Sequence, residues 1–356
     1  AANGLDAGNV RRSDMYCQFA MAAAYQAMMD SGLVSGENVE PERLGTYIGS
    51  GIGGMQTFVA ETGKLLNEGV HRISPLFVPM MISNIASGNV AIKFNAQGVC
   101  LPVVTACATG THAAGEAYRA IKHGYADAII TGGSEAAINP VSIAGFSNCK
   151  ALTRAEDPKQ ASLPFDKRRA GFVLGEGAGI ILLEEYEHAK ARGAKIYGEI
   201  VGCGLSSDAY HITAPHPEGM GASKVMRLAL EDAGLSPEDV DYINVHGTST
   251  PLGDVAELRA VKSLFGDHAY KLNISSTKSM HGHLLGAAGA IESLACIHAI
   301  CDSIVPPTIN FSEEDPDIDY SLNLTLNEPQ KRTVNVAVNN TFGFGGHNSC
   351  LIFKKF

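Results

Sequence analysis

The sequence predicts an α/β protein whose strands are largely buried and mostly parallel. Short apolar runs alternate with glycine-rich turns and longer helical segments along the 356 residues. Hydrophobic residues make up 45% of the chain, and its 39 glycines suit many tight strand-to-helix turns. A strand followed by a turn of small residues recurs at 129–135 and 336–346, which indicates an internal duplication.

The individual elements follow from this alternation. The apolar runs predict strands at 45–48, 103–105, 128–131, 179–183, 199–204, 242–245, 272–275, 333–338 and 350–354. Longer segments predict helices at 14–30, 111–123, 223–233, 253–265 and 286–301. We expect Ser13 to cap the first helix and Ser31-Gly32 to end it, and Ser236-Pro237 to start a short helix before the strand at 242.

Composition excludes several classes of protein. A net charge of −10 argues against general nucleic-acid binding. No apolar run approaches the ~20 residues of a membrane span, and residues 1–14 show no signal peptide. The eight cysteines have no C-x-x-C pair, which favours reduced thiols and a cytoplasmic location. The histidines lack metal-ligand spacing, so we predict no metal site.

Cys107 is the candidate nucleophile. It lies between the apolar pair Val103-Val104 and a Thr/Gly-rich helix start. The positive end of that helix favours a thiolate and lowers the pKa of such a thiol below the free value of about 8.5. The helix N–H groups could also stabilise an oxyanion. The alternative, a buried structural cysteine, does not need this flanking sequence.

Two histidines and a lysine are candidate partners of a nucleophile. His246 follows the predicted strand at 242–245, and His283 precedes a glycine-rich helix start. Catalytic side chains favour the carboxyl ends of strands in such folds. Lys278 precedes His283 by five residues. For each histidine taken singly, the alternative is a turn histidine that caps the next helix, and for Lys278 it is a solvated loop lysine. His281 is the more ordinary neighbour.

Two glycine-rich segments allow other interpretations. Gly49-Ser50-Gly51-Ile52-Gly53-Gly54 fits the dinucleotide fingerprint after a strand, but no second strand ending in an acidic residue follows. A nucleotide-binding oxidoreductase is therefore a weak alternative. The run 342–346, Phe-Gly-Phe-Gly-Gly, predicts a tight backbone that carries a ring into a pocket, or a hairpin with buried rings.

Taken together, these motifs resemble the β-ketoacyl-[acyl-carrier-protein] synthases, and most strongly their elongating (type II) condensing enzymes. The resemblance rests on Thr-Ala-Cys107, Val-His246-Gly-Thr-Ser-Thr, Lys278-Ser-x-x-Gly-His283 and Phe342-Gly-Phe-Gly-Gly, and it covers essentially the whole chain. It implies a thiolase-like five-layer α/β/α/β/α fold with two duplicated halves. We expect an N-terminal half at 1–193, which lacks the family's usual opening strand and helix, and a C-terminal half at 194–356.

The resemblance also implies roles for individual residues. Cys107 would take an acyl group from an acyl carrier protein, and His246 and His283 would stabilise the enolate formed from malonyl-ACP. Lys278 would act electrostatically, and the main-chain N–H groups of Cys107 and Phe342 would form the oxyanion hole. Acyl or pantetheine contacts are implied for Ile52, Phe146, Thr248, Thr250, Phe342 and Phe344, and supporting carboxylates for Asp254 and Glu257.

The implied function is decarboxylative Claisen condensation in type II fatty acid biosynthesis, by a cytoplasmic homodimer that spans no membrane. No permanently bound cofactor is implied, since the phosphopantetheine belongs to the carrier protein. A polyketide-type ketosynthase with the same chemistry is the nearest alternative. Because carrier proteins are acidic, docking needs a local basic patch. The candidates are Arg11-Arg12, Lys150 with Arg154, and 167–169.

Overall fold

The computed structural model describes residues 4–356, and the chain forms two compact units. The first unit contains residues up to 144 together with 175–195 and 284–291. The second contains residues 145–174, 196–283 and 292–356. Helix α7 (Pro140–Asn148) and helix α12 (Ala288–Asp302) each run from one unit into the other.

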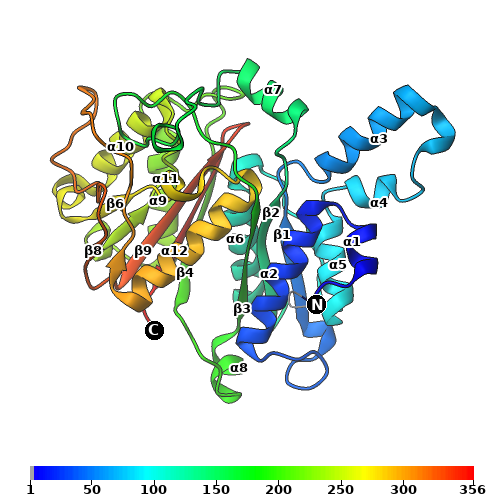
Figure 1. Ribbon diagram of the computed structural model, residues 1–356. Coiled ribbons are helices and arrows are strands. Elements are labelled where there is room, and N and C mark those ends of the chain that lie inside the picture. The colour runs from blue at the N-terminus through cyan, green and yellow to red at the C-terminus, as the bar shows by residue number, and fades with distance from the viewer. Residues whose placement is uncertain (1–3) are drawn as a thin grey trace. The chain divides into compact units, whose positions relative to one another are not determined.

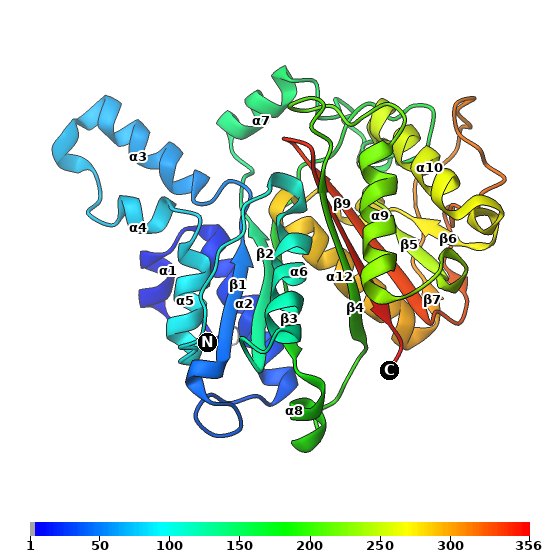
Figure 2. The same ribbon diagram turned by 180° about the vertical axis from the view of Figure 1, so that it is seen from behind.

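The first unit is built on a three-stranded sheet in the order β1-β2-β3 (Figure 1). Strand β1 is parallel to β2, and β3 is antiparallel to β2. Helix α2 packs on one face of the sheet and α6 on the other (Figures 1 and 2). The strands are β1 (Leu44–Gly49), β2 (Ala128–Glu135) and β3 (Gly177–Glu184), and the helices are α1 (Ala7–Arg12), α2 (Met15–Ser31), α3 (Met55–Glu68), α4 (Phe77–Met81), α5 (Ile85–Phe94), α6 (Thr109–Lys122) and α8 (Tyr186–Ala191).

The second unit is built on a five-stranded sheet in the order β4-β10-β9-β5-β6. Strand β5 is parallel to both β6 and β9, and β10 is antiparallel to β9 and β4. The elements are β4 (Glu199–Ser207), α9 (Met220–Ala233), β5 (Tyr242–Asn244), α10 (Pro251–Phe265), β6 (Asn273–Ser275), α11 (Lys278–His281), β9 (Val336–Gly343) and β10 (His347–Lys354), with a short pair β7 (Ile304–Val305) and β8 (Gln330–Lys331).

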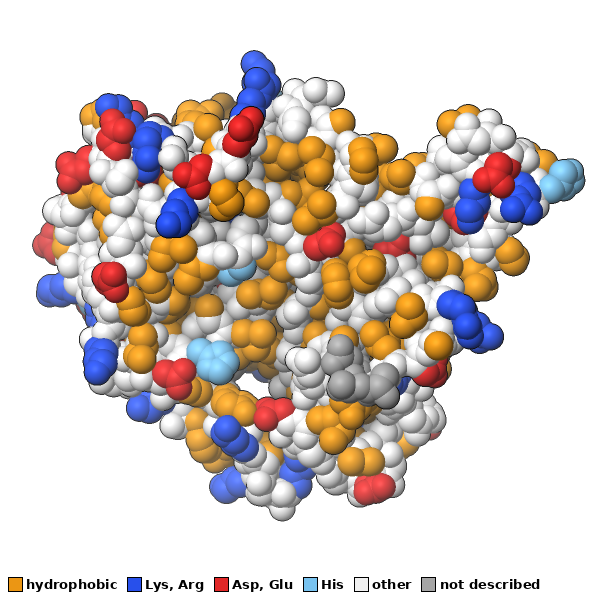
Figure 3. All heavy atoms as spheres, in the orientation of Figure 1, with side chains coloured by type: hydrophobic (Ala, Val, Ile, Leu, Met, Phe, Trp, Pro, Cys, Tyr) orange, Lys and Arg blue, Asp and Glu red, His pale blue; other side chains and the backbone are white. Residues whose placement is uncertain are grey.

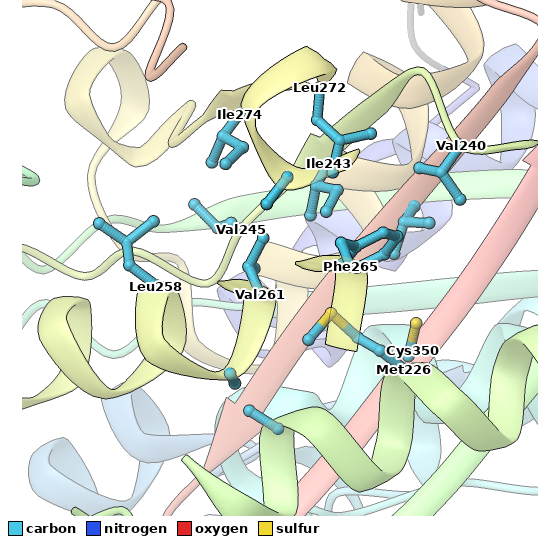
Figure 4. Packing of buried hydrophobic residues seen from close by; sticks show 14 of the residues in the cluster. Met226, Val240, Ile243, Val245, Leu258, Val261, Phe265, Leu272, Ile274 and Cys350 are labelled. Atoms are coloured by element: carbon cyan, nitrogen blue, oxygen red, sulfur yellow. The ribbon is translucent and has the colours of Figure 1, made fainter. Parts of the chain in front are cut away.

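Each unit has its own hydrophobic core. In the first unit, apolar residues of α2 and α5 pack against β1 and β2. In the second unit, helices α9 and α10 cover the sheet with buried side chains such as Met226 and Val261 (Figure 4). Burying such side chains contributes about 1.5–3 kcal/mol each. The alternation of apolar and glycine-rich segments therefore predicts the α/β class correctly.

Several predicted boundaries are confirmed, and others are wrong. Gly32 ends α2 with a φ of 63°, as predicted, and Ser236 caps a 3₁₀ turn at Pro237–Asp239. The cap of α2 is Asp14 rather than Ser13, since the Asp14 carboxylate accepts the N–H of Tyr16. Helices α1, α3, α4, α5, α7, α8 and α11 were not predicted.

The predicted strand at 103–105 is also wrong. The segment just before it pairs with β1 through a single bridge between Thr46 and Cys100. The N–H of Thr105 instead donates to the Thr109 hydroxyl at 2.9 Å, which starts the turn into α6. This local hydrogen bond takes the place of strand pairing, despite the β-branched sequence of Val103 and Val104.

One segment, Leu285–Asp302, has the length and apolar composition of a membrane span. However, 61% of it is buried inside the protein. A core helix has the same composition, so the segment is only weak evidence for a span.

Candidate active site

Cys107 lies in the first unit, at a turn that hydrogen bonds hold on both sides. It is the middle residue of a 3₁₀ turn, Ala106–Ala108, directly before α6, and its side chain is buried. Ala106 has a φ of 50°, the left-handed conformation that an L side chain rarely adopts. Nδ1 of His112 lies 3.0 Å from the Thr105 hydroxyl and 3.1 Å from the Ala108 carbonyl oxygen. Contacts on both sides therefore hold the thiol at the positive end of α6.

His246 and His283 lie side by side in the second unit. Their ring centroids are 5.3 Å apart, in an edge-to-face arrangement. His246 follows strand β5, and the main-chain N–H of His283 donates to the carbonyl oxygen of Val173 at 2.7 Å. Burial, and then the charge of Lys278, hold the pKa of both imidazoles well below 6.5. Both rings are therefore neutral near pH 7 and can offer an N–H to a developing anion.

Lys278 is buried, so it is not the solvated loop lysine that the sequence also allowed. It is the first residue of α11, is 1% exposed, and forms an ion pair with Glu292 of α12. Removing one partner of a buried ion pair leaves the other charge buried and uncompensated, so each residue requires the other. Glu292 was missed as a partner. Its signal was an acidic residue in an otherwise apolar helix.

Asp254 and Glu257 are fully buried carboxylates on α10 that hold main-chain groups near the histidines. Glu257 accepts the N–H of His246 at 2.8 Å and that of Gly247 at 2.9 Å. Asp254 accepts the N–H of Phe165 at 3.0 Å and that of Thr250 at 3.4 Å. Burial raises the pKa of Glu257 to about 7 and that of Asp254 to about 6.

Aromatic rings continue from the histidines in the second unit. Phe342 lies 5.5 Å from His246, and Phe172 lies 4.9 Å from His283, both measured between ring centroids. Phe146 contacts both Phe172 and Phe344. Phe172 was missed, although its glycine-rich surroundings are visible in the sequence. The run 342–346 is a hairpin turn between β9 and β10 that leaves Phe342 and Phe344 only partly buried.

The second unit thus brings together His246, His283, Lys278, Glu257, Asp254 and these aromatic residues. It also places the hydroxyls of Thr248 and Thr250 at 3.1 Å from one another. Cys107 and Ile52 belong to the first unit.

The glycine-rich turn after β1 is already occupied by a carboxylate of its own unit. Glu135 accepts the N–H groups of Gly51 at 2.8 Å and Ile52 at 3.2 Å. A dinucleotide phosphate would need such N–H donors and would be repelled by this carboxylate. The geometry therefore disfavours the oxidoreductase alternative.

A thiol at a helix start in one unit, and two neutral imidazoles with a buried lysine in the other, are the kinds of group that a condensing acyltransferase of the thiolase-like type needs. The family model for the β-ketoacyl synthase N-terminal domain matches residues 2–189, and that for the C-terminal domain matches residues 197–312. The chain belongs to the β-ketoacyl synthase family.

Similar proteins agree with this assignment. The chain is 51% identical to the 3-oxoacyl-[acyl-carrier-protein] synthase 2 of Synechocystis sp., over 100% of this chain and 85% of that protein. The corresponding Staphylococcus aureus protein is 51% identical, over 99% of this chain and 84% of that protein.

Solved structures agree as well. A β-ketoacyl synthase from Burkholderia phymatum matches with a TM-score of 0.91 and 35% identity, over 99% of this chain and 85% of that one. A ketosynthase in complex with a type II polyketide acyl-carrier protein matches with a TM-score of 0.90 and 36% identity, over 96% of this chain and 85% of that one. The chain is thus a condensing enzyme with the thiolase-like fold, of the type that elongates acyl chains in fatty acid biosynthesis.

Proposed function

We propose that Cys107 carries the growing acyl chain. Its thiolate attacks the thioester of an acyl group on a carrier protein's phosphopantetheine, and the pantetheine thiolate leaves. The N-terminal end of α6 favours the thiolate form of Cys107. The assignment of the oxyanion hole to the N–H groups of Cys107 and Phe342 stays a prediction.

We propose that His246 and His283 promote decarboxylation of malonyl-ACP. Breaking the bond to the carboxylate releases CO₂ and leaves an enolate, whose oxygen needs hydrogen-bond donors. The single observation that carries this proposal is the pair of neutral imidazoles, the buried one of His283 and the half-buried one of His246, whose ring centroids lie 5.3 Å apart. The enolate carbon then attacks the acyl-Cys carbonyl, the C–S bond breaks, and the thiolate of Cys107 returns.

Supporting residues follow from their contacts. Lys278 is paired with Glu292, and its positive charge lowers the pKa of His246. The same charge would stabilise the enolate. Glu257 positions His246 through its main chain, and Asp254 positions Thr250. We propose that Thr248 and Thr250 bind the pantetheine amides. The acyl chain would contact Ile52, Phe146, Phe342 and Phe344.

We propose an acyl carrier protein as the partner, and the exposed basic residues narrow its docking site. Arg169 is buried and bound to Asp315, and Arg168 is paired with Asp166. The pairing makes residues 167–169 the weakest candidate. Lys150 and Arg154 are exposed, as are Arg11 and Arg12, so these two segments stay as candidates.

We also propose a homodimer, supported by exposed apolar surface on the first unit. Helices α3 and α4 form an arm that projects from this unit (Figure 1), and Figure 3 shows hydrophobic side chains on it interspersed with charged ones. A second apolar stretch lies before Cys107. Large exposed apolar surfaces on folded proteins commonly mark interaction sites. The exposed residues include Phe58, Leu65, Leu66, Val70, Val78, Val99, Leu101 and Val104.

A polyketide-type role is the second candidate, favoured by the structural similarity to a ketosynthase of a type II polyketide system. The identity to that chain is 36%, against 51% to proteins named 3-oxoacyl-[acyl-carrier-protein] synthase 2. Fatty acid elongation is therefore the better supported role. A cytoplasmic location stays a prediction.

The test is intact-protein mass spectrometry after addition of acyl-ACP and then malonyl-ACP. We expect an acyl adduct on the wild-type protein that malonyl-ACP discharges as 3-oxoacyl-ACP, and none on Cys107→Ala. An adduct that malonyl-ACP cannot discharge would contradict the roles of the two histidines. Absence of any adduct on folded wild-type protein would overturn the nucleophile assignment.

A further inference from the structure

Glu135, the last residue of β2, is a buried carboxylate that the proposed reaction does not use. Its side chain is 0% exposed. Oε1 accepts the Ser50 hydroxyl at 2.8 Å and the Ile52 N–H at 3.2 Å. Oε2 accepts the N–H groups of Gly51 at 2.8 Å and Gly286 at 2.9 Å. One side chain thus ties β2 to the turn after β1 and to the 3₁₀ turn Leu285–Ala287.

The hydrogen-bond pattern requires the ionised form of Glu135. Three of its partners are main-chain N–H groups, which can only donate. The fourth, Ser50, accepts the N–H of Gly53 at 2.9 Å, so its own hydrogen points to Glu135. A protonated carboxyl would set an O–H against one of these donors. The site is therefore built for a carboxylate that only accepts.

The main chain that Glu135 holds packs directly against the segment that carries Cys107. The 3₁₀ turn at Leu285–Ala287 contacts both the turn around Cys107 and helix α6. A Cβ added to Gly51 would lie 3.3 Å from the carbonyl oxygen of Ala106, and one added to Gly110 would lie 3.0 Å from that of Gly286. Any displacement of Gly51 or Gly286 would therefore be passed to the residues on either side of the nucleophile.

We infer that Glu135 is a positioning residue for the nucleophile, which acts by fixing the two turns that hold the Cys107 segment. This inference rests on the proposed role of Cys107 as the acyl acceptor. Glu135 is fully buried, so it cannot contact a carrier protein at the surface. Its loss should therefore slow acyl transfer without weakening the binding of acyl-ACP.

The test is the rate of acylation of Glu135→Gln at varied acyl-ACP concentration. In either orientation the amide NH2 faces at least one main-chain N–H that cannot accept, so at least one turn must move. Misplacement of a reacting group by about 1 Å costs up to about 100-fold. We expect the maximal acylation rate to fall about 10- to 100-fold, while the half-saturating concentration changes less than about threefold.

The matched control is Glu184→Gln. Glu184 lies at the opposite end of the same strand pair, where its carboxylate binds Arg192 and His188. We expect this variant to acylate at the wild-type rate. Rates are taken per folded molecule, with thermal melting as the check, so that lost stability alone does not count as lost positioning.

The outcomes separate the two proposals. A wild-type acylation rate in folded Glu135→Gln would overturn the inference alone, whereas absence of acylation on the wild-type protein would overturn the role of Cys107 with it. If Glu135→Gln does not fold, Ser50→Ala removes one of the four donors. We then expect a severalfold lower rate, and an unchanged rate in that variant would overturn the inference.

Discussion

The two units share one strand arrangement, and each uses a buried glutamate below the turn that follows its parallel strand. Strand β1 is parallel to β2, which is antiparallel to β3, as β5 is parallel to β9, which is antiparallel to β10. Glu135 accepts the N–H groups of Gly51 and Ile52 after β1. Glu257 accepts those of His246 and Gly247 after β5.

The difference lies in where the carboxylate comes from and what it holds. Glu135 comes from the neighbouring strand and holds turns beside a thiol, whereas Glu257 comes from helix α10 and holds an imidazole. The second unit adds the buried Lys278–Glu292 pair. The same arrangement, a buried glutamate that accepts main-chain N–H groups, thus supports the proposed nucleophile in one unit and the proposed hydrogen-bond donors in the other.

The largest effect is expected for the nucleophile. Cys107→Ala should abolish condensation, because the acyl group has no sulfur to receive it. Decarboxylation of malonyl-ACP, which we assign to the second unit, should persist. The measurement is CO₂ release and 3-oxoacyl-ACP formation on the same sample. Continued condensation in this variant would contradict the division of chemistry between the units.

The next largest effect concerns the buried Lys278–Glu292 ion pair of the second unit. Lys278→Met leaves Glu292 buried and unpaired, so we expect the free energy of unfolding to fall by about 3–5 kcal/mol. The double variant Lys278→Met, Glu292→Leu should recover most of this loss, since no uncompensated charge remains. Denaturant unfolding of both variants measures the effect. A double variant as unstable as the single one would show that charge pairing is not the cause.

His283→Ala should reverse the pattern of Cys107→Ala. We expect decarboxylation to fall about 100- to 1,000-fold, as when one donor to a developing oxyanion is lost. Acylation of Cys107 should stay within about threefold of the wild-type rate. His281→Asn, two residues away, is the control and should leave both rates close to wild type. Equal loss of both steps in His283→Ala would contradict the division of chemistry between the two units.

The smallest effect tests the shared glutamates by pH. Burial raises the pKa of Glu257 from 4.5 to about 7, so the folded state holds a proton that the unfolded state releases between these values. Its contribution to stability is therefore present at low pH and lost as the pH rises through 7.

The difference in unfolding free energy between wild type and Glu257→Gln should thus shrink by about 1–3 kcal/mol from pH 4.5 to 7. Burial raises the pKa of Glu135 too, while its four hydrogen-bond donors favour the carboxylate, so Glu135→Gln should show a smaller shift of the same sign. Denaturant unfolding at a series of pH values measures both. A difference that grows with pH would contradict the raised pKa values.

The α/β class, the family and some of the local boundaries could be predicted from the sequence alone. Gly32 as a helix stop and Ser236-Pro237 as a helix start are decided by residues within a few positions, because capping is a contact between near neighbours. The motifs around Cys107 and His246 are likewise local.

Tertiary structure decided which polar groups are buried and what they bind. From the sequence, Lys278 could be a solvated loop residue. In the fold it is buried and paired with Glu292, fourteen positions away. Glu135 lies beyond the predicted strand at 128–131. Only the fold places its carboxylate against Gly51 and Gly286, which are 84 and 151 positions away. The stability of a buried charge depends on partners that the fold brings together, and no local pattern encodes those partners.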